Sequence, residues 1–267
     1  MMQTHRPVAS LSFKAGTSAQ TLRTLPEEVA VALSFNGTTQ AVMMASPADL
    51  IDFAYGFSLT EGIARPAQIE TVDIVEVEHG VDVQIWLDAN AEATLAKRRR
   101  TMAGPVGCGL CGIDSLAEAT RKMAPIPASN FTMTASEIMA AVAALPAAQP
   151  LHDATRAVHA AGFFSTGLVA VREDVGRHNA LDKLAGHLIR VAHPPGAVLL
   201  TSRVSIDMVQ KVAALGAPML IAVSAPTAHA VELADAAGIT LIAMARSDRF
   251  EAFTHTHRIA KDAANVA

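Results

Sequence analysis

Cysteine and long apolar runs are the two scarcest features of this sequence. Only two of its 267 residues are cysteines, and in a reducing compartment such a pair more often reacts or binds metal than forms a structural disulfide. No window is apolar enough for a membrane-spanning helix, and the first residues lack the apolar stretch of a signal peptide. We therefore expect a cytoplasmic protein with no membrane partner.

Basic residues are not in excess either. The chain has 21 Lys and Arg against 25 Asp and Glu, a net charge of -4, which gives no general attraction to nucleic acid. Aromatic residues make up only 4% of the chain, but hydrophobic residues make up 51%. That content is enough for the core of one large domain or two small ones, so we expect a globular protein without a nucleic-acid partner.

Patterns in the first hundred residues predict two hairpins around a helix. Two apolar runs flank Asn36-Gly37, a dipeptide that readily adopts the positive φ values of a tight turn. Ser46 and the proline after it are typical of a helix start, and Gly62 of a helix end. The expected elements are a hairpin over 29–44, a helix over 47–61 and a second hairpin from strands 72–77 and 81–86. Together they predict a small α+β domain over residues 1–105.

Short strands and helices alternate in the second half of the chain. The expected strands are 158–164, 168–171, 197–201, 218–223 and 239–244, and the expected helices are 134–145, 179–191, 205–215 and 227–237. Repeated strand-helix-strand units predict parallel pairing, with helices on both faces of the sheet. The fold class is therefore α/β, with a three-layer α/β/α domain over residues 106–267. Sites in such folds gather at the carboxyl ends of the strands.

Cys108 and Cys111 lie among glycines, in residues 106–113, which we expect to form a mobile loop. Structural zinc needs two further ligands, and the chain has no other cysteine. A dithiol redox pair, two inert cysteines and a nucleophilic thiolate that accepts and passes on a group are the other readings. For the last of these, the basic run 97–100 can supply positive potential. The residues alone leave these alternatives open.

A second polar cluster follows the strand that ends near Val171. Residues 172–182 are mostly polar or charged, where a strand is expected to meet a helix. Arg177, His178 and Asn179 would lie at the helix start and can bind an anion there. Helix capping and ordinary surface ion pairs explain the same residues equally well.

A third polar cluster follows the last apolar strand. Two arginines around a short turn suit phosphate groups or guanine edges. An ordinary polar loop explains the segment as well. Its residues are Met244, Ala245, Arg246, Ser247, Asp248 and Arg249.

Taken together, these segments resemble the FdhD/NarQ family of formate dehydrogenase accessory sulfurtransferases. The family's Cys-Gly-x-Cys-Gly loop stands here at 108–112, and its Arg-Glu-Asp-Val-Gly-Arg-His-Asn-Ala-x-Asp-Lys block is complete at 172–183. Shorter matches lie at 56–62, 209–211 and 230–234. The resemblance covers roughly residues 25 to 258.

The resemblance implies a sulfurtransferase that serves the molybdenum cofactor. Cys108 would carry a persulfide from a cysteine desulfurase to the bis-molybdopterin guanine dinucleotide molybdenum cofactor, for use by formate dehydrogenase, with Cys111 as the assisting thiol. The cofactor is a bound substrate whose guanine dinucleotide phosphates would meet Arg246 and Arg249, so guanosine diphosphate should bind, and no zinc is implied. A homodimer and a C-terminal domain similar to the cytidine deaminase fold are implied as well.

Two other functions stay open. One is a non-catalytic chaperone that binds the guanine-dinucleotide cofactor and delivers it, and the other is a zinc-dependent nucleotide enzyme. Deaminase chemistry is not expected, because Gly107 stands where a zinc deaminase has the proline before its Cys-x-x-Cys. Arg156-Ala157 and Thr201-Ser202 depart from the family pattern near the expected pocket. These departures leave open the detailed shape of the pocket and which molybdenum enzyme the protein serves.

Overall fold

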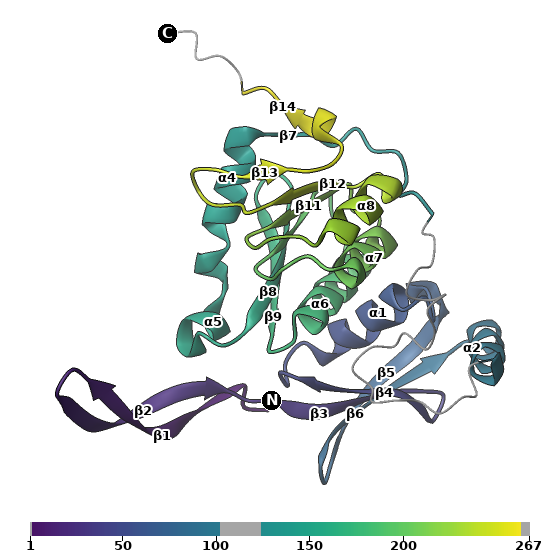
Figure 1. Ribbon diagram of the computed structural model, residues 1–267. Helices are drawn as coiled ribbons and strands as arrows, with labels where there is room; N and C mark the ends of the chain where they lie inside the picture. Colours follow the sequence, from purple (N-terminus) through teal and green to yellow (C-terminus); the bar gives the residue numbers. More distant parts are fainter. Residues whose placement is uncertain (1, 102–123, 263–267) are drawn as a thin grey trace.

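The computed structural model describes residues 2–101 and 124–262, and its first half contains a four-stranded sheet (Figure 1). The strand order is β4-β3-β6-β5, with β3 and β6 parallel and both hairpins antiparallel. Asn36 and Gly37 form the first turn with φ values of 47° and 77°, so the predicted hairpins are confirmed. The strands are β3 (Val29–Phe35), β4 (Thr38–Ala45), β5 (Ile69–Val77) and β6 (Gly80–Leu87).

Helix α1 (Leu50–Thr60) covers the inner face of this sheet, and its start corrects the sequence prediction. The helix was expected to begin at Pro47 with Ser46 as its cap, but Asp49 flanks its first residue. Ser46 is fully buried instead, and its hydroxyl, the group that would cap a helix, accepts a hydrogen bond from the Val175 N–H, far along the chain. A tertiary contact has therefore taken the residue that local capping chemistry would use. A 3-10 turn (Pro66–Gln68) and helix α2 (Ala89–Thr101) complete this part.

The second half contains a six-stranded mixed sheet in the order β13-β12-β11-β10-β8-β9. The strands are β8 (His159–Phe164), β9 (Leu168–Asp174), β10 (Ala197–Leu200), β11 (Met219–Ala222), β12 (Thr240–Ala243) and β13 (Glu251–Ala252). Parallel pairing is confirmed for β10, β11 and β12, whereas β8, β9 and β13 pair antiparallel. The exceptions follow from connection length, because the short turn between β8 and β9 leaves no room for a crossover.

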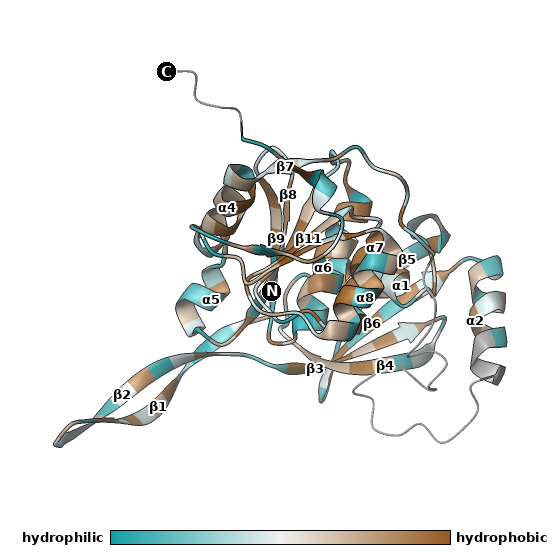
Figure 2. Cartoon of the chain, turned by 45° about the horizontal axis from the view of Figure 1, so that its top comes forward, coloured by the Kyte–Doolittle hydropathy of each residue, from teal (hydrophilic) through white to brown (hydrophobic). Residues whose placement is uncertain are grey.

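Helices lie on both faces of the six-stranded sheet, as the alternation predicts. Leu200, Leu220 and Leu241 face one apolar core, while Leu199, Ile221 and Ile242 face the other. Figure 2 shows hydrophobic (brown) strand segments between α4 and the helices α6 and α7. The first core is closed by α6 (Arg177–Arg190), α7 (Ile206–Leu215) and α8 (Ala228–Ala237), and the second by α4 (Ala135–Ala144). The fold is therefore mixed α/β. Within the described ranges no helix is both long and apolar enough to cross a membrane.

Smaller elements complete the fold, and one hairpin was not predicted. Strands β1 (His5–Lys14) and β2 (Thr17–Pro26) form a two-stranded antiparallel ribbon that extends from the body (Figure 1). The others are β7 (Met133–Thr134), a 3-10 turn (Pro146–Ala148), α5 (Pro150–Thr155), a 3-10 turn (Thr256–Arg258) and β14 (Ile259–Ala260). The predicted domain boundary at residue 105 and the loop 106–113 lie outside the described residues, so both stay predictions.

Candidate functional site

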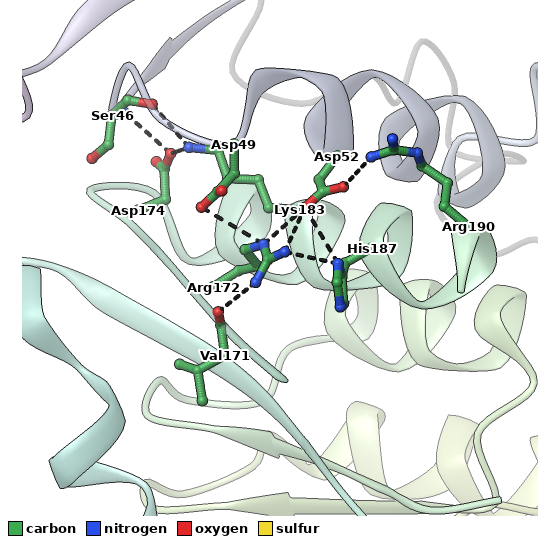
Figure 3. A network of polar contacts seen from close by, with 9 residues as sticks. All are labelled: Ser46, Asp49, Asp52, Val171, Arg172, Asp174, Lys183, His187 and Arg190. Atoms are coloured by element: carbon green, nitrogen blue, oxygen red, sulfur yellow. Dashed lines mark hydrogen bonds and ion pairs between the residues drawn. The ribbon is translucent and has the colours of Figure 1, made fainter. Parts of the chain in front are cut away.

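The polar segment 172–183 supplies most of a buried interface between α1 and α6. Asp174 and Lys183 are both fully buried, and the Lys183 ammonium lies 2.6 Å from the Asp174 carboxylate (Figure 3). The ammonium also donates to the Ser46 carbonyl, and Asn179 donates to the Met44 carbonyl and to Asp174. Buried charges are tolerated when they are paired and hydrogen-bonded in this way. The pair ties the start of α6 to the chain just before α1.

Asp52 is the centre of a second group of charges in this interface. Its carboxylate accepts hydrogen bonds from the Arg172 guanidinium at 2.8 Å and from the Arg190 guanidinium at 2.6 Å (Figure 3). Arg172 also contacts the His187 ring at 2.8 Å. Burial, followed by the charge of Arg172, lowers the pKa of His187. A neutral ring can accept the Arg172 N–H, so Arg172 is held from three sides rather than free to bind a ligand.

Lys211 closes the same interface from α7. Its ammonium lies 2.9 Å from the Asp182 carboxylate and 2.6 Å from the Glu61 carboxylate, and it also donates to the Thr60 hydroxyl. Burial opposes the charge of Lys211, but Asp182 and Glu61 outweigh it and raise the pKa of Lys211. Lys211 therefore stays charged and links α1, α6 and α7.

Glu173, Arg177 and His178 are the polar residues of the segment that remain outside this interface, and the Glu173 carboxylate accepts hydrogen bonds from the backbone N–H groups of Leu151 and His152 in α5. Arg177 is partly exposed at the first position of α6, and within the described part of the chain it has no ion-pair partner. The His178 Nε2 atom is buried, has no hydrogen-bond partner among the described residues, and lies 3.7 Å from the Asp207 carboxylate. Burial, then the charges of Arg177 and Lys211, lowers the pKa of His178 to about 4. At neutral pH its ring is therefore uncharged, and its buried Nε2 atom faces Asp207 without a hydrogen bond.

Arg177 and His178 lie at the edge of the sheet where the parallel strands end. His159 pairs with Asp174, Ala161 with Leu200, and Leu200 with Ala222, which aligns the ends of β9, β10 and β11 with the start of β8. Strand β12 ends at the same edge, because Ile221 pairs with Ile242. Arg177 also contributes, after burial, to lowering the pKa of His159. We call this the carboxyl edge of the sheet.

The predicted segment 244–249 follows β12 at the carboxyl edge. Met244 adopts a left-handed conformation with φ of 52° and is exposed, whereas Ala245 is buried. The Arg246 guanidinium donates to the carbonyls of Val223 and Ala245, so it is fixed against the ends of β11 and β12. Ser247 and Asp248 are exposed. Arg249 is exposed too, and among the described residues its side chain has one loose contact, of 3.6 Å, with Asp248.

The structure therefore brings the two predicted polar clusters to one edge without direct contact. Strands β9 and β12 are separated by three strands in the sheet order, a distance of about 19 Å at ordinary strand spacing. Between them lies Arg203, just after β10, exposed and without an ion-pair partner in the described ranges. Arg203 was not among the predicted site residues. The signal was available, because it follows an apolar strand in the way that Arg246 does.

The departures from the family pattern also lie near the carboxyl edge. The Thr201 hydroxyl accepts a hydrogen bond of 2.9 Å from the Ala160 backbone N–H and so helps to join β10 to β8. Arg156, at the end of α5, has a φ of 58°. Cys108 and Cys111 lie outside the described residues. Within residues 2–101 and 124–262, no three His, Cys, Asp or Glu side chains gather as a metal site.

Comparison with known proteins identifies close relatives over nearly the whole chain. The family model described as FdhD/NarQ matches residues 26–260. A protein from Agrobacterium fabrum named "Sulfur carrier protein FdhD" is 55% identical over 261 residues, 96% of each chain. One of the same name from Brucella abortus is 52% identical over 95% of this chain and 96% of its own. A solved structure of a candidate formate dehydrogenase accessory protein from Desulfotalea psychrophila matches 97% of this chain and all of its own, with a TM-score of 0.75 and 24% identity, which shows the fold.

Proposed function

Because the chain belongs to the FdhD/NarQ family, we propose that it carries sulfur for the maturation of formate dehydrogenase. The observation that carries the proposal is its identity of 55% and 52% with proteins named as sulfur carriers, over almost the full length of both chains. Cys108 is the proposed persulfide carrier. A cysteine desulfurase is the proposed donor, in the cytoplasm, and the bis-molybdopterin guanine dinucleotide molybdenum cofactor is the proposed acceptor.

The loading step is an exchange between two sulfur atoms. The Cys108 thiolate attacks the outer sulfur of the persulfide on the desulfurase. The bond between the two desulfurase sulfurs breaks, its electron pair stays on the desulfurase cysteine as a thiolate, and a new sulfur-sulfur bond forms on Cys108. The step leaves the total oxidation state unchanged, so it requires no further reactant.

The release step uses the second thiol. The Cys111 thiolate attacks the inner sulfur of the Cys108 persulfide, and the outer sulfur leaves with the bonding pair as hydrosulfide. The outer sulfur is thereby reduced, and Cys111 is oxidised as a Cys108–Cys111 disulfide forms. A dithiol reductant then restores both thiols. Because Cys111 is the only other cysteine in the chain, it is the natural partner for this step.

The carboxyl edge of the sheet is the proposed binding place for the guanine dinucleotide parts of the substrate. Arg177, Arg203 and Arg249 lie along it, and none has a close carboxylate partner among the described residues. Arginine guanidinium groups recognise phosphates through paired hydrogen bonds. The separation of about 19 Å between β9 and β12 suits an extended ligand better than a single phosphate.

Mass spectrometry tests the carrier function directly. After incubation with a cysteine desulfurase and cysteine, the intact protein should gain the mass of one sulfur atom, and a reductant should remove it. Cys108→Ala should abolish the adduct, whereas Cys111→Ala should keep the adduct and slow the release of sulfide. An adduct that survives in Cys108→Ala contradicts the assignment of the carrier.

A second candidate function is a chaperone that binds and delivers the intact cofactor. The observation that favours it is the row of arginines at the carboxyl edge, because binding of the cofactor by these side chains requires neither cysteine. A variant with both Cys108→Ala and Cys111→Ala distinguishes the two functions. If the double variant restores formate dehydrogenase activity in cells that lack the protein, the function is cofactor delivery. If the double variant does not restore the activity but still binds guanosine diphosphate, the function is sulfur transfer.

A further inference from the structure

The side of the four-stranded sheet that α1 does not cover is an exposed apolar surface. Alternate residues of β3 and β6, such as Leu33 and Val83, lie in the core under α1, so the residues between them point to the opposite side, here called the outer face. The outer face is turned away from the six-stranded sheet (Figure 1). Its large apolar side chains are between 38% and 54% exposed, so no described element buries them: Val42, Met44, Val75, Val77 and Trp86. Large apolar side chains gathered on one exposed face mark an interaction surface.

Asp82 lies in the middle of the outer face, and one of its carboxylate oxygens has no hydrogen bond. The residues that stand side by side across the four strands are Val42, Ala32, Asp82 and Val75. The Oδ2 atom of Asp82 accepts a hydrogen bond of 2.9 Å from the Gln84 amide. The Oδ1 atom is buried and accepts none from the described residues. A buried carboxylate oxygen without a donor costs free energy, so this position is incomplete in the free chain.

Every charged residue in the four strands is acidic. Strands β3 and β4 contain no charged residue, and β5 and β6 contain Glu70, Asp73, Glu76 and Asp82. Asp73 lies beside Gln84, so it shares the outer face with Asp82. A surface with charge of one sign attracts and orients a partner of the opposite sign. Among basic side chains arginine suits Asp82 best, because its guanidinium can donate to both oxygens of one carboxylate.

The four-stranded sheet is also close along the chain to the proposed sulfur carrier. Helix α2 follows β6 and packs Ala91 and Leu95 into the core of the same sheet. The helix ends at Thr101, seven residues before Cys108. Seven extended residues span about 24 Å at most. Cys108 is therefore tethered close to any protein that docks on this sheet.

We propose that the outer face of the four-stranded sheet is the docking surface for the sulfur donor, which places an arginine on Asp82 between apolar side chains. The proposal rests on the proposed function, because a cysteine desulfurase is the occupant. The apolar side chains contribute the affinity, and the acidic residues contribute the orientation and the rate of encounter. Side chains at an interface commonly change rotamer on docking, which opens the Oδ1 atom of Asp82 to the arginine. The carboxyl edge belongs to the other sheet and stays free for the acceptor.

Asp82→Asn tests the contact and keeps the shape of the side chain. Calorimetry with a cysteine desulfurase from the same organism should give a dissociation constant at least tenfold higher for Asp82→Asn, because a charge-assisted contact is lost. Val42→Ser should raise the dissociation constant about fivefold through lost apolar contact. Glu232→Gln and Val169→Ser change an exposed acidic and an exposed apolar residue of the second half, so both should bind as the unmodified chain does. Cys108→Ala should bind equally well, because docking precedes the chemistry.

Three further measurements separate docking from a structural role of Asp82. Asp82→Asn removes a charge with an unbonded buried oxygen, so the free chain should be no less stable in urea. In the loading reaction Asp82→Asn should raise the donor concentration that gives half the maximal rate and leave the maximal rate unchanged. Trp86 is the only tryptophan of the chain, so fluorotryptophan gives one fluorine NMR signal on the outer face. That signal should move when unlabelled desulfurase is added.

Four results would each overturn the proposal. They are no binding of the desulfurase to the unmodified chain, equal affinity of Asp82→Asn, an unmoved fluorine signal, and a lower stability of free Asp82→Asn. A change in the oligomeric state of Asp82→Asn would also overturn it, because the outer face would then serve a contact between copies. Failure of the proposed function gives a different result, because the unmodified chain would then bind the desulfurase and gain no sulfur from it.

Discussion

Residues 172–183 show how much of the site the sequence could predict. The density of polar groups predicted a functional segment, but the structure divides it among three roles, one of which is the contact of Glu173 with the backbone N–H groups at the start of α5. Asn179, Asp182 and Lys183 face α1, while Arg177 and His178 remain at the carboxyl edge. Positions 179, 182, 183 and 186 share one helical face, so the periodicity was readable in the sequence. What covers that face depends on tertiary packing, and no local pattern specifies it.

His178 leads to a prediction on acid stability. Its pKa is lowered from 6.5 to about 4 in the folded state, so the unfolded chain binds a proton more readily. The stability from this residue is complete above pH 6.5 and is lost as the pH falls from there toward 4. Between pH 7.5 and 5 the loss should be about 2 kcal/mol. Urea unfolding at both pH values measures it.

The variant His178→Gln isolates the contribution of this one residue to the acid-induced loss in the free energy of unfolding. His159 and His187 also have a lowered pKa, so part of the acid loss remains in the variant. We expect the difference in free energy of unfolding between the two pH values to be smaller in His178→Gln than in the unmodified protein. His257→Gln, at an exposed histidine, controls for the loss of an imidazole. Equal pH dependence in His178→Gln and the unmodified protein would contradict the assignment.

Arg249 leads to a prediction on ligand binding. It is exposed at the carboxyl edge and only loosely paired, unlike Arg246, which the carbonyls of Val223 and Ala245 hold. Loss of a charge-assisted contact to phosphate costs about 1.5 to 3 kcal/mol, so Arg249→Ala should weaken the binding of guanosine diphosphate at least tenfold. Calorimetry measures it, with Arg65→Ala as the control at an exposed arginine elsewhere. Unchanged affinity in Arg249→Ala would move the nucleotide away from this loop.

At the level of elements, the spacing of short apolar segments between Gly and Pro residues predicted most of the strands and helices of the second half. Short apolar strands between Gly- or Pro-marked helices identified β10, β11 and β12 and their parallel order. The β1–β2 ribbon was missed because its turn lacks an Asn-Gly or Asp-Gly pair and its strands bury almost nothing in one chain. The start of α1 was misplaced because the Ser46 hydroxyl accepts a hydrogen bond from the Val175 N–H instead of capping the helix. The second error concerns a contact that is distant in sequence, whereas the first concerns a local hairpin that leaves no pattern of alternating burial.

The contact between α1 and α6 gives a prediction about elements. Gly56 and Gly186 lie where the two helices touch, and a Cβ on Gly186 would stand 1.7 Å from the Asp52 carbonyl oxygen. Gly186→Ala raises helix propensity by about 1 kcal/mol, but the clash with backbone must push the helices apart. We expect a net loss of about 2 kcal/mol or more in the free energy of unfolding.

The matched control for this prediction is Gly167→Ala. Gly167 has no neighbour within 4 Å of the added carbon, so the same change there should alter stability by less than about 1 kcal/mol. Urea unfolding of both variants under one set of conditions gives the comparison. If Gly186→Ala were as stable as the unmodified chain, the close approach of α1 and α6 would be wrong.

At the scale of the whole molecule, the α1–α6 interface joins two sheets with separate cores. Helix α1 covers the four-stranded sheet, and its other side meets α6, which covers the six-stranded sheet. Unfolding either part would expose Asp174, Lys183, Asp182 and Lys211, which are buried as charged pairs. Both members of each pair belong to the second part, but they also bond to Ser46, Thr60 and Glu61 of the first part, and Asp52 of the first part pairs with Arg172 and Arg190 of the second. The cost of breaking these contacts opposes independent unfolding. The two parts should therefore unfold as one cooperative unit, whatever their boundary in the sequence.

Two probes of unfolding test this cooperativity. Trp86 fluorescence reports on the four-stranded sheet, and far-UV circular dichroism reports mainly on the helices, most of which cover the six-stranded sheet. Their urea transitions should coincide at a fixed protein concentration. Lys183→Met leaves the Asp174 carboxylate buried without its cation, so it should remove about 3 kcal/mol or more and shift both transitions together. If the circular dichroism transition of this variant moved and the Trp86 transition did not, the four-stranded sheet would be an independent unit and the interface would contribute little to its stability.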